Sequence, residues 1–143
     1  MRLEKTVTTT AEKAQAWAAL SAVDQWPRWI SNYQSIELID PAPLAVGSRA
    51  RVKQRGLRAG TWEITELVPG AVFTWQNSQP GVHTVARHEV GAEADGRTRI
   101  VLTLEQTGPL AGIVGSLLRG KITRYVDEEA AGHVAAAEDR AGS

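Results

Sequence analysis

The sequence predicts an α+β protein in which one curved antiparallel sheet packs against a single long C-terminal helix. Segments with strand patterning follow one another almost without interruption over residues 34–106, and the links between them are too short for crossover helices. One segment with helical patterning, residues 109–138, comes after them. A lone helix buries its apolar stripe best across the concave face of the sheet. We therefore expect a gap between helix and sheet in which a small molecule binds.

Composition narrows the class of protein. A length of 143 residues suits one domain, which we place at residues 1–143. The 16 basic and 16 acidic residues give a net charge of +0, which argues against binding to nucleic acid or to an anionic membrane. No cysteine is present, so disulfides and thiolate chemistry are excluded. The first residues lack the apolar run of a signal peptide, and no apolar stretch approaches the ~18 residues of a membrane span. We therefore expect a cytoplasmic protein.

The first third of the chain carries a strand and two helices. Residues 1–9 are rich in threonine and predict a strand. Thr10 is a suitable N-cap for a helix over residues 11–20. Asp24 is a suitable cap for a second, short helix that carries two tryptophans. The buried stripe of the first helix is predicted to contain Ala14, Trp17, Ala18 and Leu20.

Six further strands follow as a meander, which brings the predicted total to seven. Turn dipeptides such as Pro69-Gly70 and Asp95-Gly96 separate them. The predicted strands cover residues 34–40, 48–55, 60–68, 72–78, 82–92 and 97–106.

Alternation along these strands separates an inner face from an outer one. Glu66 is the only acidic residue that parity assigns to the inner face. Gln54 and His88 are polar members of a mostly apolar surface, a composition that is typical of ligand pockets. If no ligand contacts them, each of these two side chains needs another hydrogen-bond partner: the other, a buried water or the backbone. The predicted inner face contains Val52, Gln54, Trp62, Ile64, Phe73, Trp75, Thr84, Ala86, His88, Ile100, Leu102 and Leu104.

The final helix has one apolar stripe and several glycines. Gly112, Gly115 and Gly120 indicate either close approach to the sheet or a bend that leaves room beneath. Tyr125 is the helix residue best suited to direct a hydroxyl towards the gap. Residues 134–143 are expected to be loosely held. The predicted stripe contains Leu110, Ile113, Val114, Leu117, Leu118, Ile122, Tyr125 and Val126.

Few residues suggest a reaction. His88 is a candidate general acid or base, although a buried histidine satisfied by hydrogen bonds is the simpler interpretation. No metal site is predicted, because His83 and His88 face opposite ways on one strand and His133 is placed at the distant end of the helix. Residues 115–121 come close to a phosphate-binding loop but lack its final hydroxyl and lie within a helical pattern. We therefore expect no cofactor.

Motifs along nearly the whole chain resemble the polyketide cyclase/dehydrase-like branch of the START-like (SRPBCC) superfamily, which includes the birch pollen allergen. The chain departs from the pattern at His133, where the resemblance leads us to expect an apolar residue. The motifs are Asp24-x-Trp26-Pro27-x-Trp29, Gly47-Ser48, Trp62-Glu63-Ile64, Phe73-Thr74-Trp75, Pro80-Gly81-Val82, Ala86-Arg87-His88, Gly96-x-Thr98-Arg99, Gly108-Pro109-Leu110 and Arg124-Tyr125-Val126-x-x-Glu129-Ala130-x-Gly132.

The resemblance implies a helix-grip fold, in which a curved seven-stranded sheet wraps the last helix above a deep pocket. We expect the pocket to bind a small hydrophobic or amphipathic molecule, lipid-like or polyketide-like, in a monomer or weak homodimer. Two alternatives remain at this point: a polyketide cyclase or dehydratase that uses His88, and an interaction module whose cavity is filled by tryptophan. The predicted binding residues are Val52, Gln54, Trp62, Ile64, Phe73, Trp75, Thr84, Ala86, His88, Ile100, Leu102, Leu118, Ile122 and Tyr125.

Overall fold

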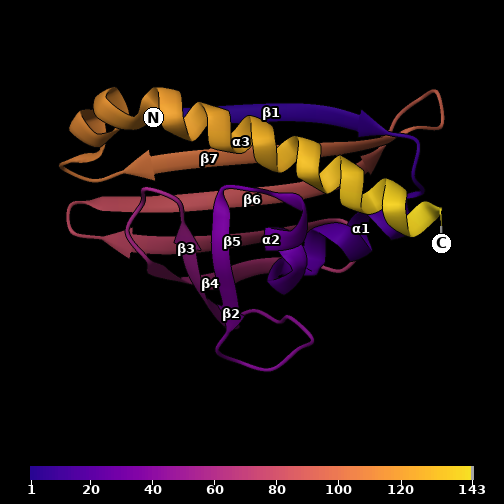
Figure 1. Ribbon diagram of the computed structural model, residues 1–143, viewed down its shortest axis with the longest axis horizontal. Helices are drawn as coiled ribbons and strands as arrows, with labels where there is room; N and C mark the ends of the chain where they lie inside the picture. Colours follow the sequence, from indigo (N-terminus) through magenta and orange to yellow (C-terminus); the bar gives the residue numbers. More distant parts are fainter. Residues whose placement is uncertain (143) are drawn as a thin grey trace.

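The computed structural model describes residues 1–142, and Ser143 lies outside the described residues. A seven-stranded sheet curves beneath one long helix, α3 (Ala111–Ala141), as Figure 1 shows. Two short helices lie under the C-terminal half of α3. The remaining elements are β1 (Arg2–Thr9), α1 (Lys13–Ser21), the 3₁₀ turn η1 (Val23–Gln25), α2 (Trp26–Trp29), β2 (Tyr33–Leu38), β3 (Arg49–Gln54), β4 (Gly60–Val68), β5 (Val72–Gln79), β6 (Val82–Ala92) and β7 (Thr98–Thr107).

The sheet has the order β1-β7-β6-β5-β4-β3-β2, and every neighbouring pair of strands is antiparallel. Strands β2 to β7 therefore form the predicted meander, and β1 joins β7 at the other edge of the sheet. Gly70 and Gly81, in two predicted turns, have φ angles of +81° and +78°, which L side chains rarely adopt. The predicted fold class is confirmed.

A bulge in β4 corrects the parity assignment of one residue. The register with β5 slips between Ile64 and Glu66, so that Glu66 faces outwards. Its carboxylate accepts a hydrogen bond from Thr74 Oγ1 at 2.8 Å and lies 3.4 Å from Arg87 Nε. A one-residue insertion moves every later side chain of a strand to the opposite face. Alternation counted along the sequence cannot reveal such an insertion.

The start of α1 also differs from the prediction. The helix begins at Lys13 with Glu12 at its N-cap position, which makes no side-chain cap, and Thr9 Oγ1 rather than Thr10 accepts the backbone N–H of Ala11. Asp24 makes no capping bond either. The buried residues of α1 are Ala16, Ala19 and Leu20, whereas Ala14 is exposed. Alanines all around this helix leave its apolar face poorly marked in the sequence.

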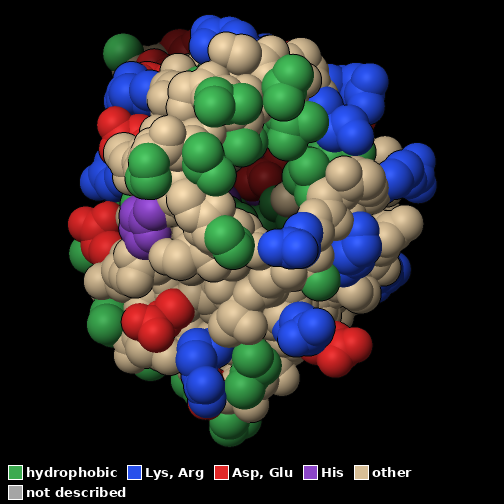
Figure 2. All heavy atoms as spheres, turned by 90° about the vertical axis from the view of Figure 1, so that its left-hand side faces the viewer, with side chains coloured by type: hydrophobic (Ala, Val, Ile, Leu, Met, Phe, Trp, Pro, Cys, Tyr) green, Lys and Arg blue, Asp and Glu red, His purple; other side chains and the backbone are tan. Residues whose placement is uncertain are grey.

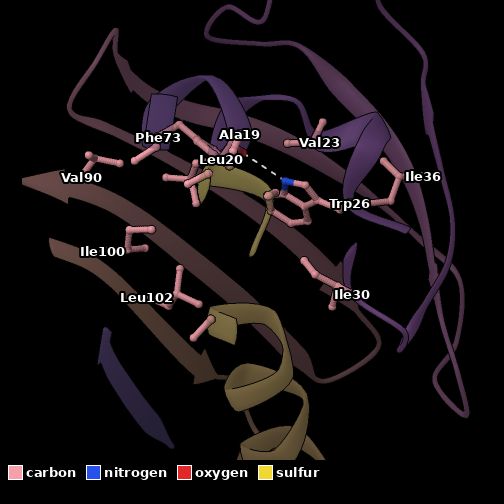
Figure 3. Close-up of a cluster of buried hydrophobic side chains, with 14 of the residues drawn as sticks. Ala19, Leu20, Val23, Trp26, Ile30, Ile36, Phe73, Val90, Ile100 and Leu102 are labelled. Carbon is pink, nitrogen blue, oxygen red and sulfur yellow. Dashed lines mark hydrogen bonds between the residues drawn. The ribbon is translucent and has the colours of Figure 1, made fainter. Parts of the chain in front are cut away.

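The core lies at one end of the space under α3. Trp26 lies at its centre, 2% exposed, and its indole Nε1–H donates to the carbonyl of Leu20 over 3.1 Å. Figure 3 shows side chains from both short helices meeting those of the sheet around this indole. The residues with almost no exposure include Leu20, Val23, Trp26, Ile30, Ile64, Phe73 and Ile100.

Two predictions about α3 are wrong. Leu110, Ile113 and Leu117, assigned to the buried stripe, are 45%, 60% and 78% exposed, because the first turns of α3 have no layer of residues on that side. The tail from residue 134 is helical as far as Ala141, with Ala136 and Ala137 buried. Thr9 Oγ1 donates to the Glu138 carboxylate over 3.0 Å. Among residues 1–142, no helix is both long enough and apolar enough to cross a membrane.

Candidate ligand cavity

A cavity of about 330 Å³ separates the N-terminal half of α3 from the inner face of the sheet. Figure 2 shows its mouth as a hollow ringed mainly by hydrophobic side chains. The tryptophans do not fill this space, which counts against an interaction module with a filled cavity. The lining includes Tyr33, Val52, Gln54, Leu57, Arg58, Trp62, Trp75, Asn77, Val82, Thr84, Ala86, His88, Leu102, Leu104, Gln106, Val114, Leu118, Ile122, Tyr125, Val126 and Glu129.

The predicted binding residues divide between this cavity and the core. Ile64, Phe73 and Ile100 do not line the cavity, because α1, α2 and Trp26 cover their part of the sheet. Those that line the cavity are Val52, Gln54, Trp62, Trp75, Thr84, Ala86, His88, Leu102, Leu118, Ile122 and Tyr125.

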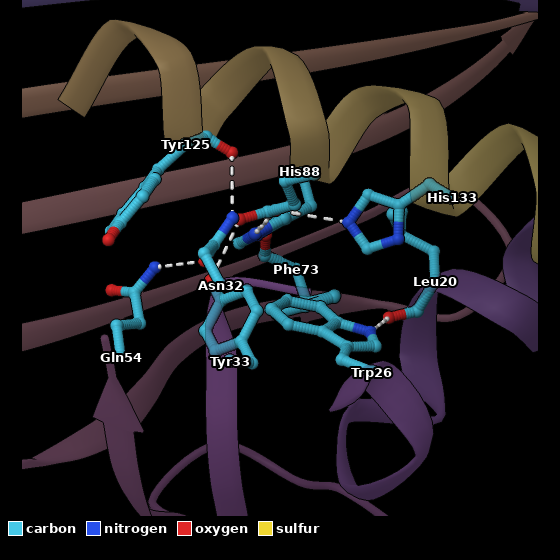
Figure 4. A network of polar contacts seen from close by, with 10 residues as sticks. Leu20, Trp26, Asn32, Tyr33, Gln54, Phe73, His88, Tyr125 and His133 are labelled. Carbon is cyan, nitrogen blue, oxygen red and sulfur yellow. Dashed lines mark hydrogen bonds and ion pairs between the residues drawn. The ribbon is translucent and has the colours of Figure 1, made fainter. Parts of the chain in front are cut away.

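Two of the predicted polar residues are held by the protein itself. Gln54 Nε2 donates to Asn32 Oδ1 at 2.9 Å, and the Tyr125 hydroxyl donates to the carbonyl of Arg55 at 2.6 Å. Asn32 Nδ2 in turn lies 3.4 Å from the carbonyl of Tyr125 (Figure 4). These bonds connect α3 to β3 and to the segment before β2. Tyr125 therefore fixes the helix above the sheet and does not present a free hydroxyl to the cavity.

Glu129 of α3 is the most unusual lining residue, since it is an acid that is only 9% exposed. The hydroxyl of Tyr33 donates to its Oε1 at 2.8 Å. His133 Nε2 lies 3.0 Å from its Oε2, and His88 Nε2 lies 3.3 Å from the same oxygen. Strands β2 and β6 and the following turn of α3 thus supply the three groups that surround this carboxylate.

Both ring nitrogens of His88 have partners. Nδ1 lies 3.3 Å from the carbonyl oxygen of Phe73, and Nε2 faces Glu129. The ring stacks on that of Phe73, with centroids 4.2 Å apart and planes inclined by 13°. Trp26 packs against the rings of both His88 and His133. The residue predicted as an acid or base is thus fixed on every side, with one nitrogen directed at a carboxylate.

The local environment determines the charge of this group. Burial raises the pKa of Glu129, but hydrogen bonds from His133 and His88 outweigh it and hold that pKa well below the usual range. Burial lowers the pKa of His133 in spite of its bond to Glu129, and a neutral imidazole still donates one N–H. Burial and the charge of Glu129 both raise the pKa of Tyr33. At neutral pH the centre holds an ionised carboxylate, a neutral His133 and a protonated Tyr33.

This centre was not predicted from the sequence. His133 is not remote from His88: the two ring centroids lie 6.4 Å apart, because α3 runs back across the sheet. One signal was available, since Ile122, Tyr125, Glu129 and His133 recur at helical spacing and share one face. Within residues 1–142, no group of three histidine or acidic side chains could hold a metal ion. Both imidazoles are directed at a carboxylate oxygen and not at a shared vacant point.

The curved sheet, the long helix α3 across it and the cavity between them together define a protein with the helix-grip fold. The chain belongs to the family described as "Polyketide cyclase / dehydrase and lipid transport", which residues 1–138 match. No curated protein matches the sequence.

Three solved structures illustrate the shared fold. The Zhui aromatase/cyclase from Streptomyces is 20% identical with a TM-score of 0.71, over 99% of this chain and 93% of that one. A START superfamily protein from Mycobacterium smegmatis is 16% identical with a TM-score of 0.70, over 93% and 96%. Ara h 8.0201 is 18% identical with a TM-score of 0.67, over 94% and 97%. At these identities the likeness shows the fold alone.

Proposed function

We propose that this protein binds a small hydrophobic or amphipathic molecule, lipid-like or polyketide-like, in the cavity beneath α3. The observation that carries the proposal is the cavity itself, about 330 Å³ and lined mostly by apolar side chains. This volume lies at the lower end of the roughly 300–1,000 Å³ of ligand sites. The family includes lipid transport in its description, and one structural neighbour is an aromatase/cyclase, which agrees with ligands of these classes.

The test looks for a copurified ligand and compares wild type with a variant whose cavity is blocked. Purified protein is examined by native mass spectrometry for a copurified ligand, and lipids and aromatic polyketides are titrated against tryptophan fluorescence, since Trp62 and Trp75 line the cavity. Ala86→Phe places a ring in the cavity. Val85→Phe, on the opposite face of β6, is the matched control.

We expect Ala86→Phe to abolish binding and Val85→Phe to leave it intact, with both variants folded by circular dichroism. If no compound binds wild type more tightly than about 1 mM, which is only ~4 kcal/mol, the proposal fails.

A second candidate, proton transfer by His88 in a cyclase or dehydratase, is favoured by one observation. The pairing of its Nε2 with Glu129 at 3.3 Å in the cavity lining is an arrangement used by general bases. It ranks second because Nδ1 is also engaged, by Phe73. This candidate predicts that His88→Gln abolishes turnover of a bound polyketide while its dissociation constant changes little. Unchanged turnover would eliminate the role.

A further inference from the structure

The acceptor capacity of Glu129 is not fully used by the protein. A carboxylate has about four positions at which it accepts hydrogen bonds. Oε1 receives one donor, from Tyr33, and Oε2 faces two, from His133 and His88. One acceptor position on Oε1 therefore remains. The side chain is 12% exposed, and because it lines the cavity, that exposed part faces the ligand space.

A second unpaired acceptor belongs to another residue of the lining. Gln106 of β7 lines the cavity, and its Oε1 is buried without a hydrogen-bond partner. Leaving a buried acceptor unpaired is unfavourable. Among the described residues, the partnerless buried side-chain atoms are both amide oxygens, Gln15 Oε1 and Gln106 Oε1. Both unfilled positions on these lining residues are thus acceptors, and the one on Glu129 is open to the ligand space.

The charges of the cavity lining also favour a hydrogen-bond donor over an anionic head group. Glu129 is the only acidic residue in the cavity lining, and Figure 2 shows an acidic side chain deep in the hollow. An anionic head group beside it would meet an ionised carboxylate in a medium of low polarity, which is strongly unfavourable. The cationic lining residues are Arg58, which is exposed, and Arg87. An anion is therefore better accommodated at Arg58 than at Glu129.

We infer that the ligand bound by this cavity carries a hydrogen-bond-donating head group, a hydroxyl or an ammonium, and enters with that group towards Glu129. The inference rests on the proposed function and specifies its ligand class. Tyr33, His133 and His88 hold the carboxylate in place, and Glu129 is the contact residue. The apolar body of the ligand then lies between Trp62, Trp75 and the Leu118–Ile122 face of α3.

The experiment compares four ligands of equal length: decan-1-ol, decylamine, the methyl ether of nonan-1-ol, and decanoate. Dissociation constants are measured by tryptophan fluorescence and calorimetry with wild type, Glu129→Gln and the control Asp127→Asn. Asp127 is an exposed acid on the same helix that pairs with Lys5 and does not line the cavity. Labelling of glutamate carboxyl carbons lets the Glu129 signal be followed by NMR in wild type.

We expect the alcohol or the amine to bind wild type about tenfold more tightly than the ether, which accepts but cannot donate. Whichever of the two binds tighter identifies the donor as neutral or cationic. Glu129→Gln reduces this preference about tenfold, and Asp127→Asn preserves it. The dissociation constant of decanoate, whose carboxylate lies at the mouth, changes by less than about twofold in Glu129→Gln. In wild type the donor ligands shift the Glu129 carbon signal and decanoate does not.

Three results overturn the inference. The ether binds as tightly as the alcohol and the amine, or decanoate loses as much affinity as they do in Glu129→Gln, or the Glu129 signal stays unmoved by a bound donor. In each case binding in the cavity, and so the proposed function, still stands. If none of the four ligands binds wild type, the proposed function and the inference fail together. The wild-type comparison remains decisive even if Glu129→Gln does not fold.

Discussion

Residues 127–141 of α3 close the core, whereas residues 111–126 of the same helix cover a cavity. The buried residues of the first group are mostly small and pack on α1 and α2, and Gly132 lies directly against Trp29 and Ile30. The second group has larger apolar side chains but no helix beneath it, and its outer residues are exposed. Small residues therefore seal one end of the sheet, and the absence of a second layer leaves the other end open.

The largest expected contrast is between a tryptophan of the closed end and one of the open end. Trp26→Ala removes a ring at the centre of the core and should cost about 3–5 kcal/mol of unfolding free energy. Trp62 is only partly buried and borders the cavity. Trp62→Ala should cost about 1–2 kcal/mol, because less buried surface is lost. Urea unfolding measures both, and equal losses would contradict the division into a packed end and an open end.

The same substitution at two glycines of α3 should act in opposite directions. A Cβ on Gly132 would lie 2.7 Å from the carbonyl oxygen of Trp29, whereas one on Gly120 meets nothing within 4 Å. Gly132→Ala should cost about 1–3 kcal/mol through overpacking. Gly120→Ala should stabilise by about 0.5–1 kcal/mol through the backbone entropy of the unfolded chain. Thermal and urea unfolding of both variants report the signs, and a stabilising Gly132→Ala would contradict the close packing.

The buried centre between the two ends should make stability depend on pH. Folding lowers the pKa of His133 below its ordinary 6.5 and that of Glu129 below its ordinary 4.5. In both cases the unfolded chain binds more protons, so the stabilisation is complete above the ordinary value and is lost as pH falls below it. Unfolding free energy should decrease by up to about 1.4 kcal/mol per pH unit for each group.

The control for this prediction is His133→Gln. The titratable side chains that contact His133 are Glu129 and His88. The variant should show a shallower decline between pH 6.5 and 4.5 and keep the decline below that range. Urea unfolding across this range measures the slopes. A wild type that gains stability on acidification would contradict the assigned charges.

The smallest effect is expected on the outer side of the open end. Leu117 is 78% exposed, so Leu117→Gln should change unfolding free energy by less than about 0.5 kcal/mol. Ligand affinity should also stay unchanged, because Leu117 does not line the cavity. A large loss of either, by urea unfolding or fluorescence titration, would mean that this side chain is covered by something the single chain does not contain.

The elements could be predicted from the sequence because their signals are local. Alternation and turn dipeptides placed β4 and β6 at their observed bounds. The bulge at Glu66 could not be predicted, since one extra residue leaves the pattern of apolar residues almost intact. The exposure of Leu117 depends on what lies beneath the helix, which helical periodicity does not report.

The centre around Glu129 could not be predicted from the sequence for a different reason. Its members come from β2, β6 and α3, and Tyr33 lies 96 positions before Glu129 in the chain. Only the curvature of the sheet brings them together. His88 was identified because strand parity turned it inwards. Glu129 and His133 were not, because charged residues near the end of a helix are usually solvated.

Binding in the cavity is tested most directly by locating decan-1-ol on methyl-labelled protein through intermolecular NOEs. Leu102 and Ile122 line the cavity, whereas Ile113 and Leu117 lie on the outside of the same helix end. We expect NOEs from the alkyl chain to the methyl groups of Leu102 and Ile122. NOEs confined to Ile113 and Leu117 would place the ligand on the surface and contradict the claim that the cavity is the binding site.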